Sequence, residues 1–137
     1  MNINTKAVEA LREIIKGNKS FTENHRSDYF SGHMSSQHPF ITLVSCSDSR
    51  VQPSVLLPDA IDKIFTVENI GNQILVNEGS VDYGIYHLHT PVLLVMGHSD
   101  CGAIKAYMKG YQNEHDSIRK ELDFLKQAFA KCEQTDD

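Results

Sequence analysis

The chain has 137 residues, of which 40% are hydrophobic and 23% are charged, and this composition predicts one globular domain with a substantial core. Its formal net charge of -5 argues against nucleic acid or an anionic membrane as a partner, because both bind basic surfaces. No apolar run is long enough to span a membrane, and the N-terminal stretch MNINTKAVEALREIIKGNK lacks the apolar centre of a secretion signal. We therefore expect a cytoplasmic protein.

The first part of this single domain, residues 1–38, is expected to form a helix and an arm. Residues 5–17 predict the helix, and Gly17 is placed to end it. Four apolar residues share one stripe of that helix: Val8, Leu11, Ile14 and Ile15. Residues 19–38 are polar and show no period, so we expect them to lie over the surface of this or another subunit.

Residues 39–137 are expected to form an α/β core around a mostly parallel sheet with flanking helices. Three short apolar runs predict the strands: PFITLVSC (39–46), KIFTV (63–67) and PVLLVMG (91–97). Between them, QPSVLLPDA fits a short helix, and SVDYGIYHLH carries apolar residues at helical spacing. This alternation of strands and helices predicts right-handed crossovers between parallel strands.

After Cys101 the chain is predicted to be helical, with a strong amphipathic helix over residues 116–132. Five residues form its apolar stripe: Ile118, Leu122, Leu125, Phe129 and Cys132. Cys132 is therefore expected to be a core residue.

Cys46 and His98 lie at the carboxyl ends of two different predicted strands, where parallel sheets build their sites. Cys101 follows His98 in an H-x-x-C pair on a strand-to-helix turn. A lone cysteine at a strand end is usually a small buried hydrophobic residue, and a lone histidine there usually caps or hydrogen-bonds. Together, however, two thiolates and one imidazole are a good zinc ligand set that leaves a fourth position open, as catalytic zinc sites do.

Asp48 and Arg50 follow Cys46 at alternate positions. The Asp48 carboxylate can accept a hydrogen bond from zinc-bound water, or it can reach the metal and close the open position. A pair with Arg50 would keep the carboxylate ionised and directed away from the metal through charge-assisted hydrogen bonds. Because two thiolates cancel the charge of Zn²⁺, we expect the water to ionise above the pKa of about 7 found in three-histidine sites.

The motifs CSDSR (46–50) and GHSDCGA (97–103) resemble those of the plant-like branch of the β-class carbonic anhydrases, and the resemblance covers nearly the whole chain. It implies zinc-dependent, reversible hydration of carbon dioxide to bicarbonate and a proton by zinc-bound hydroxide. It also implies three zinc ligands and a gating pair: Cys46, His98 and Cys101, with Asp48 and Arg50.

The resemblance further implies a narrow, mostly apolar CO₂ pocket that is shared across the interface of a homodimer or larger homo-oligomer. Gln37 in QHPF, Phe65 in KIFTV and Tyr83 in SVDYGI match the pocket residues of the family. Ordinary core packing is the alternative for Phe65 and Tyr83. Gly102 is expected to allow a close backbone approach at the start of the next helix.

Two departures from the family pattern leave alternatives open. Glu68 in VENIGN stands where the family usually has arginine, which reverses a charge near the pocket or the dimer contact. The family also continues into one or more further strands, so a chain ending at Asp137 would be truncated at its C-terminus and leave strand 91–97 as an apolar edge, unless a partner subunit covers it. The alternatives are a truncated, non-catalytic zinc-binding homologue and a hydrolase of carbon disulfide or carbonyl sulfide.

Overall fold

The computed structural model of this chain describes residues 5–32 and 34–130, so Cys132 lies outside the described residues. The chain divides into two compact units, Met1–Gln37 and His38–Asp137. Within the described ranges, no helix is both long enough and apolar enough to cross a membrane.

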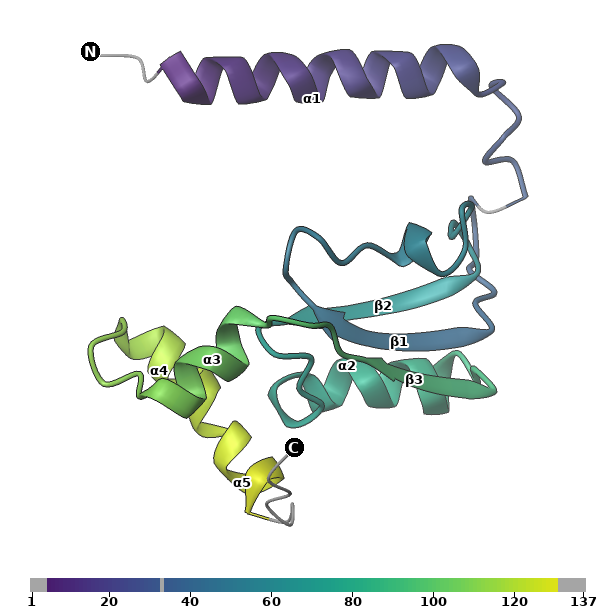
Figure 1. Cartoon of the computed structure of the whole chain (residues 1–137). Coiled ribbons are helices and arrows are strands. Elements are labelled where there is room, and N and C mark those ends of the chain that lie inside the picture. The colour runs from purple at the N-terminus through teal and green to yellow at the C-terminus, as the bar shows by residue number, and fades with distance from the viewer. Residues whose placement is uncertain (1–4, 33, 131–137) are drawn as a thin grey trace. The chain divides into compact units, whose positions relative to one another are not determined.

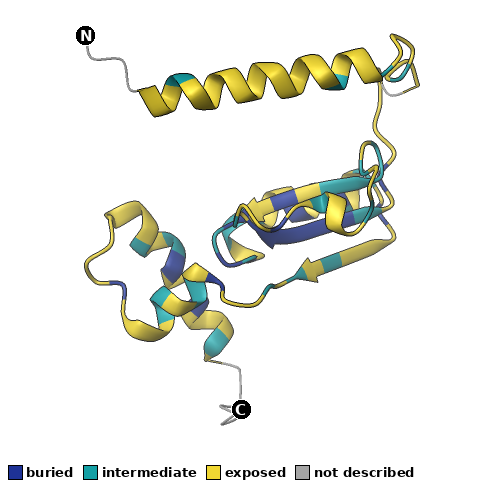
Figure 2. Ribbon diagram, turned by 45° about the horizontal axis from the view of Figure 1, so that its top comes forward, coloured by how far each residue is buried: buried dark blue, intermediate teal, exposed yellow. Residues whose placement is uncertain are grey.

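The first unit contains one helix, α1, which spans Thr5–Asn24. The predicted end at Gly17 was wrong, because the helix continues for seven residues beyond it. A Cβ at Gly17 would meet no described atom within 4 Å, so this glycine is in open space, where it costs a helix only about 1 kcal/mol. The apolar stripe of α1 is exposed, with Leu11, Ile14 and Ile15 between 59% and 67% accessible (Figure 2).

The second unit is built on three parallel strands in the order β2-β1-β3, which confirms the predicted α/β fold (Figure 1). The strands are β1 (Ile41–Cys46), β2 (Ile64–Asn69) and β3 (Val92–Met96). β1 is central, and all but its first residue are buried, as its continuous apolar run indicated.

β3 lies at the edge of this sheet and pairs only with β1 among the described residues. Three of its apolar side chains are exposed, with accessible fractions of 41% to 47%: Val92, Leu93 and Val95. This is the apolar edge expected from the sequence.

A continuous helical segment packs on one face of the sheet. It starts with the 3₁₀ turn η2 (Leu75–Asn77), continues as α2 (Glu78–Asp82) and ends as the π-helical turn η3 (Tyr83–His87). Val81 of α2 packs against Val44 and Val67 of the strands. The helix predicted between the first two strands is reduced to one 3₁₀ turn, η1 (Pro53–Val55).

Gly84 allows the helical segment to approach the sheet closely. A Cβ at this position would lie 2.1 Å from Thr42 Oγ1 and 2.9 Å from Thr42 Cγ2. The Thr42 hydroxyl is buried and hydrogen-bonds the Thr90 hydroxyl at 2.7 Å, and Thr90 Oγ1 donates to the Gly84 carbonyl at 3.2 Å. The contact has no room for any side chain at residue 84.

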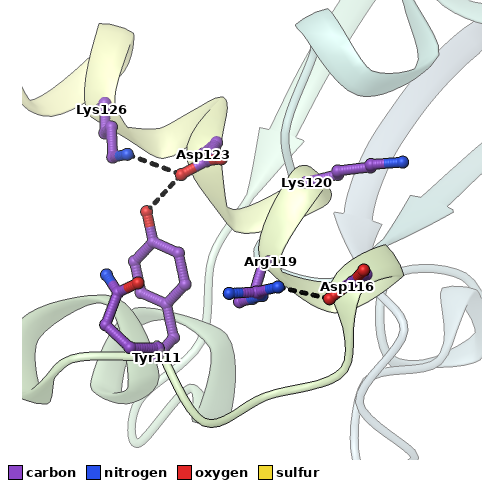
Figure 3. A pocket seen from close by; sticks show the side chains of 7 residues that line it. Tyr111, Asp116, Arg119, Lys120, Asp123 and Lys126 are labelled. Carbon is purple, nitrogen blue, oxygen red and sulfur yellow. Dashed lines mark hydrogen bonds and ion pairs between the residues drawn. The ribbon is translucent and has the colours of Figure 1, made fainter.

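Beyond β3 the chain forms α3 (Gly102–Lys109), α4 (Asp116–Asp123) and α5 (Leu125–Phe129). The single helix predicted over residues 116–132 is therefore interrupted at Phe124. Leu122 and Leu125, on either side of the interruption, are buried together with Tyr111. The Tyr111 hydroxyl donates to Asp123 at 2.7 Å, and Lys126 pairs with the same carboxylate at 2.6 Å (Figure 3).

Candidate metal centre

Three metal-binding side chains meet where two neighbouring strands end. Cys46 is the last residue of β1, His98 follows β3, and Cys101 directly precedes α3. Their ligand atoms all lie within 4.8 Å of one another. Both cysteines are free thiols and are buried, with exposed fractions of 4% and 7%. The three residues thus converge as the sequence indicated, and metal binding by them stays a prediction.

The arrangement of these ligands suits a tetrahedral zinc ion. The Sγ atoms of Cys46 and Cys101 are 3.8 Å apart. Two Zn–S bonds of about 2.3 Å at the tetrahedral angle also separate their sulfurs by about 3.8 Å. His98 Nε2 is buried and has no hydrogen-bond partner among the described residues, which is costly unless another group satisfies it. A zinc ion would satisfy this nitrogen and keep one position open.

The turn between His98 and Cys101 depends on the backbone of Asp100. Asp100 has a φ of 63°, in the left-handed region that aspartate tolerates better than most residues. Its carboxylate pairs with Lys105 in α3. The Lys105 N–H donates to the Cys101 carbonyl at 3.0 Å, and this is the first hydrogen bond of that helix. The turn allows two residues three positions apart both to reach Cys46.

Asp48 and Arg50 form a two-pronged ion pair beside the ligands. Arg50 Nε and Nη2 donate to the two Asp48 carboxylate oxygens at 2.8 and 2.7 Å. The backbone N–H of Arg50 also donates to Asp48 Oδ1, at 3.0 Å. These hydrogen bonds hold the pKa of the Asp48 carboxyl well below its usual range, and those from the Arg50 side chain have the largest effect. The same pairing raises the pKa of the Arg50 guanidinium above its usual range. Asp48 Oδ2 lies 3.9 Å from His98 Nε2, so an ionised carboxylate is held at the edge of the ligand cluster.

Phe65 and Tyr83 contact each other, but they lie far along the sheet from the ligand cluster. Their ring centroids are 5.7 Å apart, and Tyr83 also stacks on His87 at 4.4 Å. In the strand register Phe65 pairs with Thr42, near the start of β1, whereas Cys46 is at its end. Four residues of a parallel strand span about 13 Å. The structure therefore does not bring Phe65 and Tyr83 to the Cys46 of their own chain.

Gly102 and Glu68 make none of the ligand contacts just described, and Gln37 belongs to the other unit. Gln37 is an exposed residue of the first unit. Gly102 is the first residue of α3, and a Cβ there would meet no described atom within 4 Å. No described atom approaches this position closely, and the role of Gly102 at the pocket stays a prediction. Glu68 is exposed on β2, where it pairs in register with Ser45.

Asn69 is a supporting residue that the sequence analysis missed. It ends β2 with 6% exposure, and its carbonyl accepts from the Ser47 N–H, next to Cys46, at 2.9 Å. Its side chain accepts from the Gln73 N–H at 2.7 Å and donates to the Gln73 carbonyl at 2.6 Å and to Asn77 Oδ1 at 2.9 Å. The available signal was an amide side chain two residues after the apolar run 63–67, because such a group can both donate and accept.

Residues 41–137 match a family model described as carbonic anhydrase. A carbonic anhydrase from Synechococcus elongatus is 34% identical over 117 residues, which cover 77% of this chain and 43% of that protein. This chain belongs to the carbonic anhydrase family. Carbonic anhydrase 2 from Mycobacterium tuberculosis is 31% identical over 110 residues, covering 75% of this chain and 53% of that protein. The chain thus spans about half the length of these relatives.

Solved structures identify the fold as that of the β class. The β-carbonic anhydrase CcaA matches with a TM-score of 0.70 and 29% identity, over 89% of this chain and 59% of that chain. The Coccomyxa β-carbonic anhydrase in complex with acetazolamide matches with a TM-score of 0.66 and 27% identity, over 95% of this chain and 59% of that chain. A structure from Sordaria macrospora shares the fold, with a TM-score of 0.76 at 21% identity over 87% of this chain and 64% of that chain. The resemblance to β-class enzymes is therefore confirmed.

Proposed function

We propose that this carbonic anhydrase homologue interconverts CO₂ and bicarbonate at a zinc ion held by Cys46, His98 and Cys101. The observation that carries the proposal is the convergence of their ligand atoms within 4.8 Å at the ends of two strands. Bound zinc would supply Lewis acidity, which makes water a nucleophile toward the CO₂ carbon near neutral pH. Hydration consumes one water molecule and releases bicarbonate and one proton.

In this proposal Asp48 orients the attacking water by accepting a hydrogen bond from it. Its Oδ2 lies 3.9 Å from the ligand atom of His98, so it reaches a molecule bound at the same centre. Arg50 engages both oxygens of the carboxylate and thereby keeps it ionised and away from the open position. If Arg50 were removed, Asp48 could occupy that position and block the substrate.

The pocket residues Phe65 and Tyr83 act, in this proposal, on the metal centre of a second copy. Within one chain the strand register separates them from Cys46 by about 13 Å, so each chain carries halves of two different sites. We therefore propose a homodimer or a larger homo-oligomer as the active form. The Sordaria macrospora relatives are tetrameric, which supports assembly.

Stopped-flow measurement of CO₂ hydration by the zinc-loaded protein, between about pH 6.5 and 9, tests the activity. We expect a rate well above that of the buffer. Stoichiometric zinc with a background hydration rate would instead favour a non-catalytic zinc-binding homologue. A faster reaction with carbonyl sulfide or carbon disulfide than with CO₂ would favour the hydrolase.

Mixing two inactive variants tests the shared pocket. Cys46→Ser removes a metal ligand, and Tyr83→Asp puts a charge into the pocket at a half-exposed residue. After subunit exchange in equal amounts, half of the dimers contain both variants and one intact site, so activity should return to about a quarter of wild type. Cys46→Ser mixed with Cys101→Ser should restore nothing, since both changes affect the same half of the site. No recovery in the first mixture would refute the shared pocket.

A further inference from the structure

Arg50 has a second anchor besides the Asp48 carboxylate. Its Nη2 also donates to the backbone carbonyl of Asp100 at 3.3 Å. Asp100 lies in the turn between His98 and Cys101, so Arg50 joins the loop after β1 to the turn after β3. The position of Asp48 therefore depends on where Asp100 presents its carbonyl.

That carbonyl is presented by a backbone conformation that needs support. Asp100 has a φ of 63°, and a residue other than glycine stays in this region only when its surroundings hold it there. Among these surroundings is Lys105, whose ammonium pairs with the Asp100 carboxylate.

Lys105 is well placed for this task because its own backbone is fixed. Its N–H donates to the Cys101 carbonyl at 3.0 Å, in the first turn of α3. The side chains of Lys105 and Asp100 are 50% and 64% exposed, so the pair faces solvent and not the ligand cluster. Lys105 can act on the site through the Asp100 backbone, and the charge of the Asp100 carboxylate also interacts with Arg50.

We propose that Lys105 is a positioning residue for the reaction of the proposed zinc site. Its ammonium holds Asp100, the Asp100 carbonyl holds Arg50, and Arg50 holds Asp48. The inference rests on the proposed function, and it adds to that function a residue that touches neither substrate nor metal. An exposed ion pair changes an equilibrium by about two- to fivefold at most, which sets the size of the expected effect.

The test uses zinc-loaded protein with Lys105→Met, with the conservative Lys105→Arg, and with Lys109→Met as a matched control. Lys109 is exposed at the end of the same helix. The first readout is solvent exchange of the Arg50 Nε proton, followed by ¹⁵N NMR. The second is kcat/KM for CO₂ hydration. Lys105→Met should speed the exchange and lower kcat/KM, each by about two- to fivefold, at unchanged zinc content.

The other variants and a measurement at high salt sharpen the test. Lys105→Arg should keep both values near wild type, and so should Lys109→Met. Asp100→Asn tolerates the left-handed backbone but lacks the charge, so it should match Lys105→Met, and the double variant should be no worse than either alone. In about 1 M salt the difference between Lys105→Met and wild type should shrink, because an exposed pair is screened.

The proton exchange of Arg50 needs no turnover, so its outcome is separate from that of the proposed function. If the wild-type protein does not hydrate CO₂, the proposed function is wrong. The exchange data would still test whether Lys105 positions Arg50. If Lys105→Met lowers the melting temperature but leaves Arg50 exchange at the wild-type rate, Lys105 merely stabilises the start of α3 and the inference is wrong.

Discussion

Replacing Gly84 with alanine tests the closest contact between the helical segment and the sheet. The added Cβ would lie 2.1 Å from Thr42 Oγ1, 2.9 Å from Thr42 Cγ2 and 3.1 Å from Phe65 Cδ1. The two contacts with Thr42 are far inside normal van der Waals separation, the contact with Phe65 is only tight, and Thr42 is fully buried on the central strand. The helical segment must therefore move away from β1, and Thr42 must also turn and lose its hydrogen bond to Thr90.

The expected cost of Gly84→Ala is the sum of these two adjustments. Overpacking of a core costs about 1–3 kcal/mol. A buried hydroxyl left without its partner costs about 1–3 kcal/mol more, and alanine returns about 1 kcal/mol through its higher helix propensity. We expect a net loss near 3 kcal/mol in the free energy of unfolding. In a domain of this size that loss corresponds to a melting temperature lower by roughly 10 °C.

Urea unfolding, followed by circular dichroism, measures this loss, and Gly79→Ala is its control. Gly79 lies in the same helical segment, but a Cβ there would meet no described atom within 4 Å, so alanine should be neutral or stabilising by up to about 1 kcal/mol. Thr42→Ala removes the clashing atoms, so the double variant should lose less than the sum of the two single losses. If Gly84→Ala unfolds at the wild-type urea concentration, the close contact does not constrain residue 84 and the reasoning is wrong.

Three further predictions concern the ion pair, the C-terminal helices and the metal. Arg50→Ala should reduce CO₂ hydration more than zinc content. It should also lower the free energy of unfolding near pH 7 but not at low pH. The pKa of Asp48 is depressed in the folded state, so the stability that the pair contributes is present above about pH 3.9 and is lost as the pH falls toward that depressed pKa. Urea unfolding at both pH values checks this sign. Tyr111→Phe removes one hydrogen bond to Asp123 while Lys126 keeps its own, so urea unfolding should show a loss of about 1–2 kcal/mol. Removing zinc with a chelator should lower the melting temperature of the wild-type protein more than that of Cys101→Ser, because only a protein that binds the ion is stabilised by it.

The sheet could be predicted because its signals are local. β1 is buried on both faces, so its sequence is apolar without alternation, and the three strands lie where three such runs occur. The end of α1 could not be placed in the same way, since Gly17 is tolerated where it contacts nothing. The π-helical turn at Tyr83–His87 and the interruption at Phe124 arise from contacts with distant residues, which no local pattern records.

The candidate site could be predicted where its residues are close in the sequence or lie at the ends of neighbouring strands. Cys46 and Asp48 lie in one loop, His98 lies at the end of the neighbouring strand, and parallel strands bring these ends together. The distance of Phe65 from Cys46 depends on the strand register, which the sequence does not state. The role of Asp100 in the turn between His98 and Cys101 depends on its φ angle, and a short motif does not reveal that angle.

The strand order also makes the two sides of the ligand cluster unequal. Cys46 ends a strand that is paired on both edges, whereas His98 and Cys101 follow the strand that has one partner among the described residues. Edge elements open locally more often than central ones. We expect fraying of β3 to withdraw the histidine and its neighbouring thiolate together while Cys46 stays in place. Loss of a bound ion would then begin on the β3 side, and its dissociation rate would report how firmly that edge is held.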